Sequence, residues 1–300
     1  MKNKRIIRII LVVLVIILLG ALFFLPRINR NEDEGKIKII ATNFPSYDIA
    51  RALADELDIS VKMLLKPGAE LHDYDPTPQD IAAINSADVF IYIGGESETW
   101  VDKITFNEKT LVIKLINSVD LKQESPDAEE YDEHIWTSPA NYLNMLSYTR
   151  ALLARQFPEY DHQLSTNLSI YGEDIKRYDQ LFRTTKLIQP IVIADRFPFR
   201  YFVDEYHLQY SAAFPGCAEQ TEASTETIAE LITTVKNQKL PYIYALDLSN
   251  SKIARTIADA TGAEIRTLYS GHNISQDDFS AGVDMTVIYQ RNLEALQETK

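Results

Sequence analysis

Short apolar runs that alternate with stretches of helical spacing constrain the fold of this chain more than any other feature. The apolar runs of its first half lie at residues 36–41, 59–65, 88–94 and 111–116. Residues 47–57 and 79–86, which lie between these runs, place apolar side chains on one side of a helix. Alternation of this kind predicts parallel strands in a sheet that helices cover on both faces.

The second half repeats this alternation after one long helical pattern at residues 161–184. The apolar stripe of this pattern consists of Leu164, Leu168, Ile175, Leu181 and Phe182. About 24 residues at 1.5 Å each give a rod of roughly 36 Å. Further strands are predicted at residues 188–194, 210–214, 241–246 and 264–268, and further helices at residues 224–236, 251–261 and 283–296. The chain is therefore expected to have an α/β fold with mainly parallel sheets.

The N-terminus carries a signal for export. Four basic side chains within the first eight residues precede residues 9–25, a run without a single charge. With the two isoleucines before it, this run is long enough to cross a bilayer, and the basic flank predicts a cytoplasmic N-terminus. No Ala-x-Ala-like cleavage site follows the run. We therefore expect residues 1–30 to be an uncleaved signal anchor in the cell membrane, and residues 31–36 to be a polar linker to an extracytoplasmic remainder.

The charge of the chain excludes one class of partner. The net charge is −13, and the first thirty residues carry six basic and no acidic side chains, so the rest is six more negative, at −19. A domain this acidic repels nucleic acids and attracts cations, although surface acids also serve to keep an exported protein in solution. The only cysteine, Cys217, excludes an internal disulfide.

Residues 66–78, KPGAELHDYDPTP, place a histidine in a stretch that cannot be regular structure. Pro67 fixes its own φ, Gly68 permits positive φ, and Pro78 is expected to stop a helix or a central strand. His72 therefore lies on a polar loop between a predicted strand and a predicted helix, which is the usual place for a ligand site in an open α/β sheet. A single loop histidine is also typical of a solvated residue, so a second site is needed.

The second site is His134, in the segment DEHIWTSP at residues 132–139, again beside acids and followed by a proline. Together with TNFPSYDIA at residues 42–50 and ADVFIYIGGESETWVDK at residues 87–103, the two histidine loops carry a resemblance. The chain resembles the zinc- and manganese-binding solute-binding proteins of bacterial ABC importers, the ZnuA-like family. The likeness runs from about Lys36 to the end of the chain.

The resemblance implies a fold, a ligand and a partner. It implies two lobes joined by a long rigid helix, with His72 and His134 as metal ligands, and it implies no enzymatic activity. The transported ligand would be Zn²⁺, or else Mn²⁺, and the partner would be an ABC transporter permease. The expected organisation is a signal anchor at 1–30, a linker at 31–36, an N-terminal metal-binding lobe at 37–160, a connecting helix at 161–185 and a C-terminal lobe at 186–300.

One position departs from the pattern of the family. Better-known relatives carry a third histidine in the segment that is residues 195–202 here, and Arg196 occupies its position. Arginine is cationic at any relevant pH and cannot coordinate a metal. The candidates to replace it are His272, in a loop after a predicted strand, the carboxylates of Asp195 and Glu222, and the thiol of Cys217. The sequence leaves the choice among them open.

Two other classes of function use similar residues. A metal-dependent hydrolase also places histidines and acids on loops, with one coordination position left open for water. No general base can be named for such an enzyme in this sequence, and the family resemblance implies none. The second alternative is a surface adhesion or sensor module on the same fold with altered or lost metal binding, for which Arg196 is the motivating observation.

Overall fold

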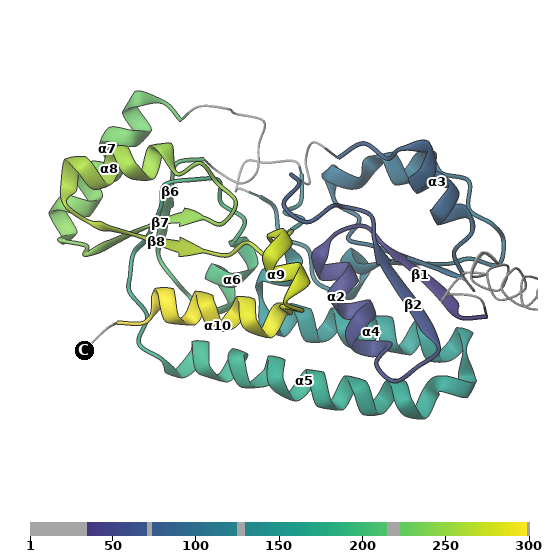
Figure 1. The fold of residues 1–300 in the computed structure, drawn as a ribbon. Helices are drawn as coiled ribbons and strands as arrows, with labels where there is room; N and C mark the ends of the chain where they lie inside the picture. Colours follow the sequence, from purple (N-terminus) through teal and green to yellow (C-terminus); the bar gives the residue numbers. More distant parts are fainter. Residues whose placement is uncertain (1–34, 71–73, 125–129, 215–222, 299–300) are drawn as a thin grey trace, which may run out of the picture. The chain divides into compact units, whose positions relative to one another are not determined.

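A computed structural model describes residues 35–70, 74–124, 130–214 and 223–298. The chain divides into two compact units, Met1–Lys36 and Ile37–Lys300, and the second contains both sheets (Figure 1). The predicted anchor at residues 1–30 lies outside the described residues. Among the helices that are described, none is both long and apolar enough to span a bilayer.

Two parallel four-stranded sheets form the framework of the larger unit. The first consists of β1 (Ile37–Ala41), β2 (Ile59–Met63), β3 (Val89–Tyr92) and β4 (Leu111–Lys114), in the order β2-β1-β3-β4. The second consists of β5 (Ile191–Ile193), β6 (Tyr210–Ala212), β7 (Tyr242–Leu246) and β8 (Glu264–Leu268), in the order β6-β5-β7-β8. In each sheet the strand order reverses at the first strand, and ligands bind outside the carboxyl ends of strands at such a switch point. The predicted fold class is confirmed.

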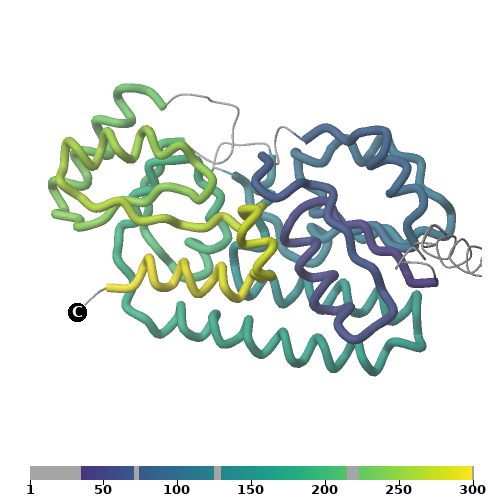
Figure 2. The backbone as a smooth tube through the Cα atoms, viewed as in Figure 1, coloured from purple at the N-terminus to yellow at the C-terminus, as the bar shows by residue number. Residues whose placement is uncertain are grey.

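Helices cover the sheets and run alongside both of them. They are α2 (Phe44–Leu53), α3 (Pro78–Asn85), α4 (Pro139–Gln156), α5 (Asp161–Thr184), α6 (Arg200–Glu205), α7 (Thr225–Gln238), α8 (Lys252–Thr261), α9 (Gln276–Ser280) and α10 (Met285–Leu296). Short 3-10 helices lie at Glu96–Lys103, Leu115–Ser118, Ile135–Thr137 and Pro158–Tyr160. The long helix α5 packs against α4 beside the first sheet and against α10 beside the second, as Figures 1 and 2 show. It therefore spans both halves of the unit.

Capping residues explain where the sequence-based helix boundaries were wrong. Helix α2 begins at Phe44, three residues earlier than predicted, because Asn43 and Ser46 form a capping box. Pro78, which was expected to stop a helix, is instead the first residue of α3, a position where its missing N–H is harmless. Helix α4 was not predicted, although Ser138 caps it and a proline follows at its first position.

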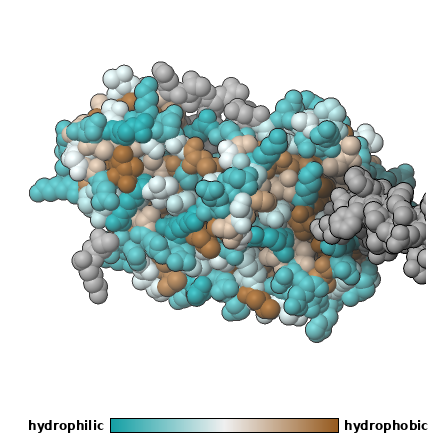
Figure 3. Space-filling view, viewed as in Figure 1, coloured by the Kyte–Doolittle hydropathy of each residue, from teal (hydrophilic) through white to brown (hydrophobic). Residues whose placement is uncertain are grey.

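One hydrophobic core extends through both halves. It contains fully buried aromatic residues from each, including Trp136, Tyr142, Tyr201, Tyr244 and Tyr289. The face of the molecule in Figure 3 is mostly hydrophilic, with hydrophobic side chains scattered singly or in small groups. The continuous core means that the two sheets are parts of one packed body.

The predicted stripe of α5 faces this core, with one exception. Leu164, Ile175 and Phe182 are buried, and Leu168 packs against them. Leu181, which the sequence placed on the same stripe, is 36% exposed. It lies next to Phe182, and neighbouring residues on a helix point about 100° apart, so only one of the two can face the core.

A buried carboxylate ties four helices together within this core. Asp48 of α2 forms an ion pair with Arg51 at 2.7 Å and accepts hydrogen bonds from the hydroxyls of Tyr142 on α4 (2.7 Å) and Tyr171 on α5. The backbone N–H of Met285, at the start of α10, donates to the same carboxylate at 3.3 Å. Burial raises the pKa of Asp48, and Arg51 and the hydroxyls act against this. The carboxylate thus links the first half to α10 of the second.

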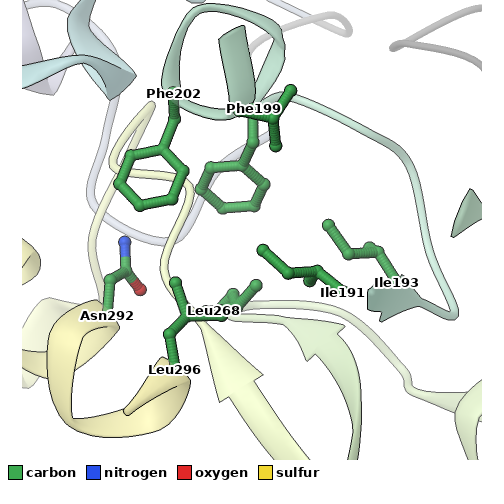
Figure 4. A pocket seen from close by; sticks show the side chains of 8 residues that line it. Ile191, Ile193, Phe199, Phe202, Leu268, Asn292 and Leu296 are labelled. Carbon is green, nitrogen blue, oxygen red and sulfur yellow. The ribbon is translucent and has the colours of Figure 1, made fainter. Parts of the chain in front are cut away.

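A small apolar cavity lies behind the second sheet. Its walls are the side chains that Figure 4 shows, with Phe199 and Phe202 on one side, Leu268 and Leu296 on the other, and Ile191 on β5. The cavity has a volume of about 10 Å³. A space of this size holds about one water molecule, so it is a packing defect of the core and not a ligand site.

Candidate metal centre

The candidate site lies where loops from the carboxyl ends of the two sheets meet. The loop after β2 and the segment after β8 are joined by Asn273, whose side-chain Nδ2 donates to the carbonyls of Lys66 (2.8 Å) and Ala69 (2.7 Å). The N–H of Gly68, which has a φ of +80°, donates to the carbonyl of Ile274 at 2.8 Å. The second half therefore holds the residues that lead to the predicted ligand at position 72. His72 itself lies outside the described residues.

His134 is held in one orientation by its own loop. The residue is 2% exposed, and both its backbone N–H (2.8 Å) and its ring Nδ1 (3.1 Å) lie within hydrogen-bond distance of Asp132 Oδ1. A neutral imidazole that donates Nδ1–H to a carboxylate carries its lone pair on Nε2. Carboxylate–histidine pairs of this kind are the common arrangement behind metal-ligating histidines.

A second histidine is connected to the first across the two halves. The ring of Trp136 lies 5.2 Å from that of His134, between centroids, and its Nε1–H donates to the carbonyl of Ser270 at 2.9 Å. Ser270 Oγ lies 2.6 Å from Nδ1 of His272. His272 therefore also uses Nδ1 for a contact within the protein. The structure thus links two of the five predicted ligands through one tryptophan and one serine.

Glu70 is an acidic residue of this site that sequence reasoning missed. Its Oε1 lies 3.9 Å from Nε2 of His272, and its Oε2 lies 3.7 Å from Nη1 of Arg196. Two ligands of one tetrahedral zinc ion, each at about 2.1 Å from the metal, lie roughly 3.4 Å apart. Glu70 and His272 are therefore close to the spacing of two ligands. The signal that could have found Glu70 was its place two residues before His72 in the same loop.

Asp195 lies beside this group with its carboxylate engaged elsewhere. One oxygen accepts the backbone N–H of Arg196 at 2.9 Å, and the other accepts the hydroxyl of Ser249. Within the described part of the chain, the carboxylate forms no salt bridge with the guanidinium groups of Arg196 or Arg200. Asp195 can still serve as a ligand, because a carboxylate has enough lone pairs to bind a metal while it accepts a hydrogen bond.

A half-buried carboxylate, Asp247, lies on the other side of Ser270 from His272. Its Oδ1 accepts the backbone N–H of Ser270 at 2.8 Å. Burial raises the pKa of Asp247 to about 6, while the hydrogen bonds from Ser270 act to lower it. Asp247 thus fixes the serine that in turn contacts His272. Its position directly after β7 was available in the sequence, but nothing there pointed to Ser270.

Two buried glutamates, Glu98 and Glu133, lie near each other beside the His134 loop. Glu98 is 2% exposed and accepts the hydroxyl of Thr42 and the N–H of Gly94 (2.7 Å). Burial raises the pKa of Glu98 to about 7, against the effect of these hydrogen bonds. Glu133, next to His134, accepts both the N–H (3.1 Å) and the hydroxyl (2.8 Å) of Ser97. The bonds of Glu133 hold the His134 loop against Ser97, whereas those of Glu98 join the segments that follow β1 and β3.

The complete ligand set stays a prediction. Within the residues that the structure describes, no three histidine, cysteine or acidic side chains lie close enough together to hold a metal ion. Glu222 and Cys217, like His72, lie outside those residues. Of the predicted ligands, the described geometry shows His134 beside Asp132, and His272 beside Ser270 and Glu70.

Comparison with known protein families shows to which family the chain belongs. The model of the ZnuA family, described as "Zinc-uptake complex component A periplasmic", matches residues 39–299. The chain belongs to the ZnuA family. This confirms the resemblance inferred from the two histidine loops. The family is one of uptake components acting outside the cytoplasm, not of enzymes, in agreement with the prediction that the chain has no catalytic activity.

Individual members show how far the likeness extends. The zinc-binding lipoprotein AdcA of Streptococcus pneumoniae is 27% identical over 298 residues, covering 94% of this chain and 59% of AdcA. The chain thus spans about three-fifths of the length of that ZnuA-family relative. The high-affinity zinc uptake system protein ZnuA of Bacillus subtilis is 27% identical over 281 residues, covering 88% of each chain. The crystal structure of the Zn(II)-bound ZnuA-like domain of AdcA superposes with a TM-score of 0.74 at 28% identity, covering 87% of this chain and 97% of the domain.

Proposed function

We propose that this chain captures a divalent transition metal outside the cytoplasm, zinc first and manganese second, and delivers it to the permease of an ABC importer. The N-terminal segment would tether it to the membrane as a signal anchor. Membership of the ZnuA family and the zinc-binding relatives support the cargo and the partner. The basic flank and the uncharged run at residues 9–25 support the anchor.

The observation that carries this proposal is the orientation of two histidines. In His134, Nδ1 faces Asp132, and in His272, Nδ1 faces Ser270. When each Nδ1–H donates to its partner, each Nε2 carries the lone pair that a metal requires. Both side chains are largely buried, with 3% and 13% of their surfaces exposed. Two imidazoles fixed in this way lose little rotamer entropy when they bind an ion.

The proposed ligand set follows from these residues and their neighbours. His72, His134 and His272 supply imidazole, and one carboxylate completes the site. Glu70 is favoured for the carboxylate because it already lies 3.9 Å from Nε2 of His272, while Asp195 and Glu222 remain the other candidates. Three nitrogens and one oxygen suit zinc, whereas manganese favours a set richer in oxygen.

The chemistry of imidazole gives the site a pH dependence. A histidine binds a metal only in its neutral form, so each bound ion excludes a proton from every coordinating ring. Zinc affinity is therefore expected to fall as the pH drops below about 6.5. The acidic loops around the site favour the approach of cations at neutral pH.

The proposal is tested by metal binding to the purified full chain after it has been stripped with a chelator. Zinc and manganese are titrated in competition with an indicator of known affinity. The variants His72→Ala, His134→Ala and His272→Ala are each expected to lower zinc affinity by at least 100-fold. The matched control is His162→Ala, because His162 is exposed at the start of α5 and contacts neither loop. Wild-type zinc affinity in both His134→Ala and His272→Ala would overturn the proposal.

A further inference from the structure

We propose that the cleft beside the metal site binds a small organic carboxylate together with the metal. The cleft lies at the carboxyl ends of β5 and β7, next to Glu70 and the first turn of α8. Figure 1 shows β7 and α8 next to each other in the second half. This inference rests on the proposed metal-binding function and names a second component of the cargo.

The size of the cleft exceeds what an ion needs. Its volume is about 590 Å³. Pockets for small organic molecules have volumes of roughly 300–1,000 Å³, whereas a metal ion fills only the space between its ligands. The lining combines polar and charged side chains with apolar ones, among them Phe214, Leu246 and Ile253.

The polar groups at the edge of the cleft suit a carboxylate. Arg196 and Lys252 supply two positive charges, and Ser249 and Asn250 supply neutral polar groups on the loop between them. Lys252 takes part in no salt bridge with any described residue. The guanidinium of Arg196 binds carboxylates in a bidentate manner, which an ammonium cannot do. This gives Arg196 a role as the carboxylate-binding residue of the cleft.

Three acids also line the cleft, and they set the order of binding. Glu70, Asp195 and Asp247 outweigh the two cations, so the empty cleft carries a net charge of −1. A divalent ion beside Glu70 changes this to +1. An ion bound by Glu70 would draw this carboxylate away from Arg196, whose Nη1 lies 3.7 Å from it. The carboxylate is therefore expected to bind the metal-loaded chain in preference to the metal-free chain.

The loop at the mouth of the cleft is strained in the way that ligand loops often are. Leu248 has a φ of +59° and Ser251 a φ of +52°, and neither is glycine. Side chains of this kind rarely adopt the left-handed region, and such strain of about 1–3 kcal/mol per residue collects at ligand-binding segments. Leu248 is also 49% exposed at this mouth. Its exposed side chain is available to cover the carbon skeleton of a bound acid.

The inference is tested by equilibrium dialysis of radiolabelled citrate against the full chain, metal-free and zinc-loaded, with protein-bound zinc measured in the same chambers. We expect about one citrate per zinc-loaded chain and at least tenfold weaker citrate binding to the metal-free chain. Arg196→Gln and Lys252→Gln are each expected to weaken citrate binding at least tenfold. The control is Lys236→Gln, an exposed lysine of α7 in the same half that does not line the cleft. Thermal unfolding of each variant establishes that it is folded.

Each outcome has one meaning. Zinc-loaded chain that binds no citrate overturns the inference and leaves the proposed function intact. If Lys252→Gln and Lys236→Gln weakened citrate binding equally, the inference would also be overturned, because the loss of binding would then reflect general surface charge. Equal citrate binding with and without zinc would refute the proposed coupling to the metal. Failure to retain zinc in chambers without citrate is a failure of the proposed function, because citrate itself chelates zinc.

Discussion

Replacing Asn273 by alanine tests whether the second half of the chain holds the loop that leads to His72. Asn273 is fully buried, and its side chain makes three hydrogen bonds, two to the carbonyls of Lys66 and Ala69 and one from the N–H of Ile274. Each bond contributes about 0.5–1.5 kcal/mol, and the groups left unpaired lose further free energy. Asn273→Ala is therefore expected to lower the free energy of unfolding by about 2–4 kcal/mol.

The assay is thermal unfolding of the metal-free chain, followed by zinc titration. For a unit of this size each kcal/mol lowers Tm by about 2–4 °C, so Asn273→Ala should lower it by about 5–15 °C. In this variant, part of the free energy of zinc binding must be used to order the loop. Each 1.4 kcal/mol used in this way weakens zinc affinity about tenfold. Asn237→Ala, on the exposed face of α7, is the control. A fall in Tm of less than 2 °C would refute the stabilising role of these hydrogen bonds. Unchanged zinc affinity would show that anchoring of the loop by Asn273 does not contribute to zinc binding.

Three further predictions concern buried acids. Asp132→Asn removes the charge behind His134 and is expected to weaken zinc affinity about 10–100-fold, measured by indicator competition, with little change in Tm. The pKa of Glu98 is raised from 4.5 to about 7, so the folded state holds this proton more tightly, and the resulting stabilisation is complete below about pH 4.5 and lost as the pH rises to about 7. In urea unfolding, the free energy of unfolding of the wild type should fall by up to about 3 kcal/mol between pH 4.5 and 7 relative to that of Glu98→Gln. If the two free energies changed in parallel with pH, Glu98 would not have a raised pKa. Tyr142→Phe removes a hydrogen bond to the buried carboxylate of Asp48 and should lower the free energy of unfolding by about 1.5–3 kcal/mol in the same assay. A loss below 0.5 kcal/mol would show that the other donors compensate.

Much of the fold could be predicted because its signals are local. The buried positions Leu164, Ile175 and Phe182 recur at helical spacing, and the helix they predicted begins and ends where α5 does. The strands of both sheets were found from apolar runs, although the structure shortens most of them. Helix α4 was missed because its apolar residues are mixed with polar ones, and the serine and proline at positions 138 and 139 were assigned to the histidine loop instead.

The site could be predicted only in part because its geometry depends on contacts between distant residues. His134 was identified from acids beside it in the sequence, and the structure shows one of them, Asp132, on its ring nitrogen. The contacts of His272 with Glu70 and of Trp136 with Ser270 join residues more than 130 positions apart. No local pattern encodes such pairs. The sequence could therefore supply candidates for ligands but not the neighbours that orient them.

The hydrogen bonds from Asn273 to the loop at Lys66 also bear on how the protein is made. They join residues 207 positions apart, so a chain synthesised from its N-terminus cannot close this contact until residue 273 has left the ribosome. Contacts of such long range form late and slow the folding of the domains that depend on them. A chain truncated before Ser270 would keep the first sheet and His134 but lack the segment that anchors the loop. The loop that leads to position 72 is thus anchored only after residue 273 has been synthesised.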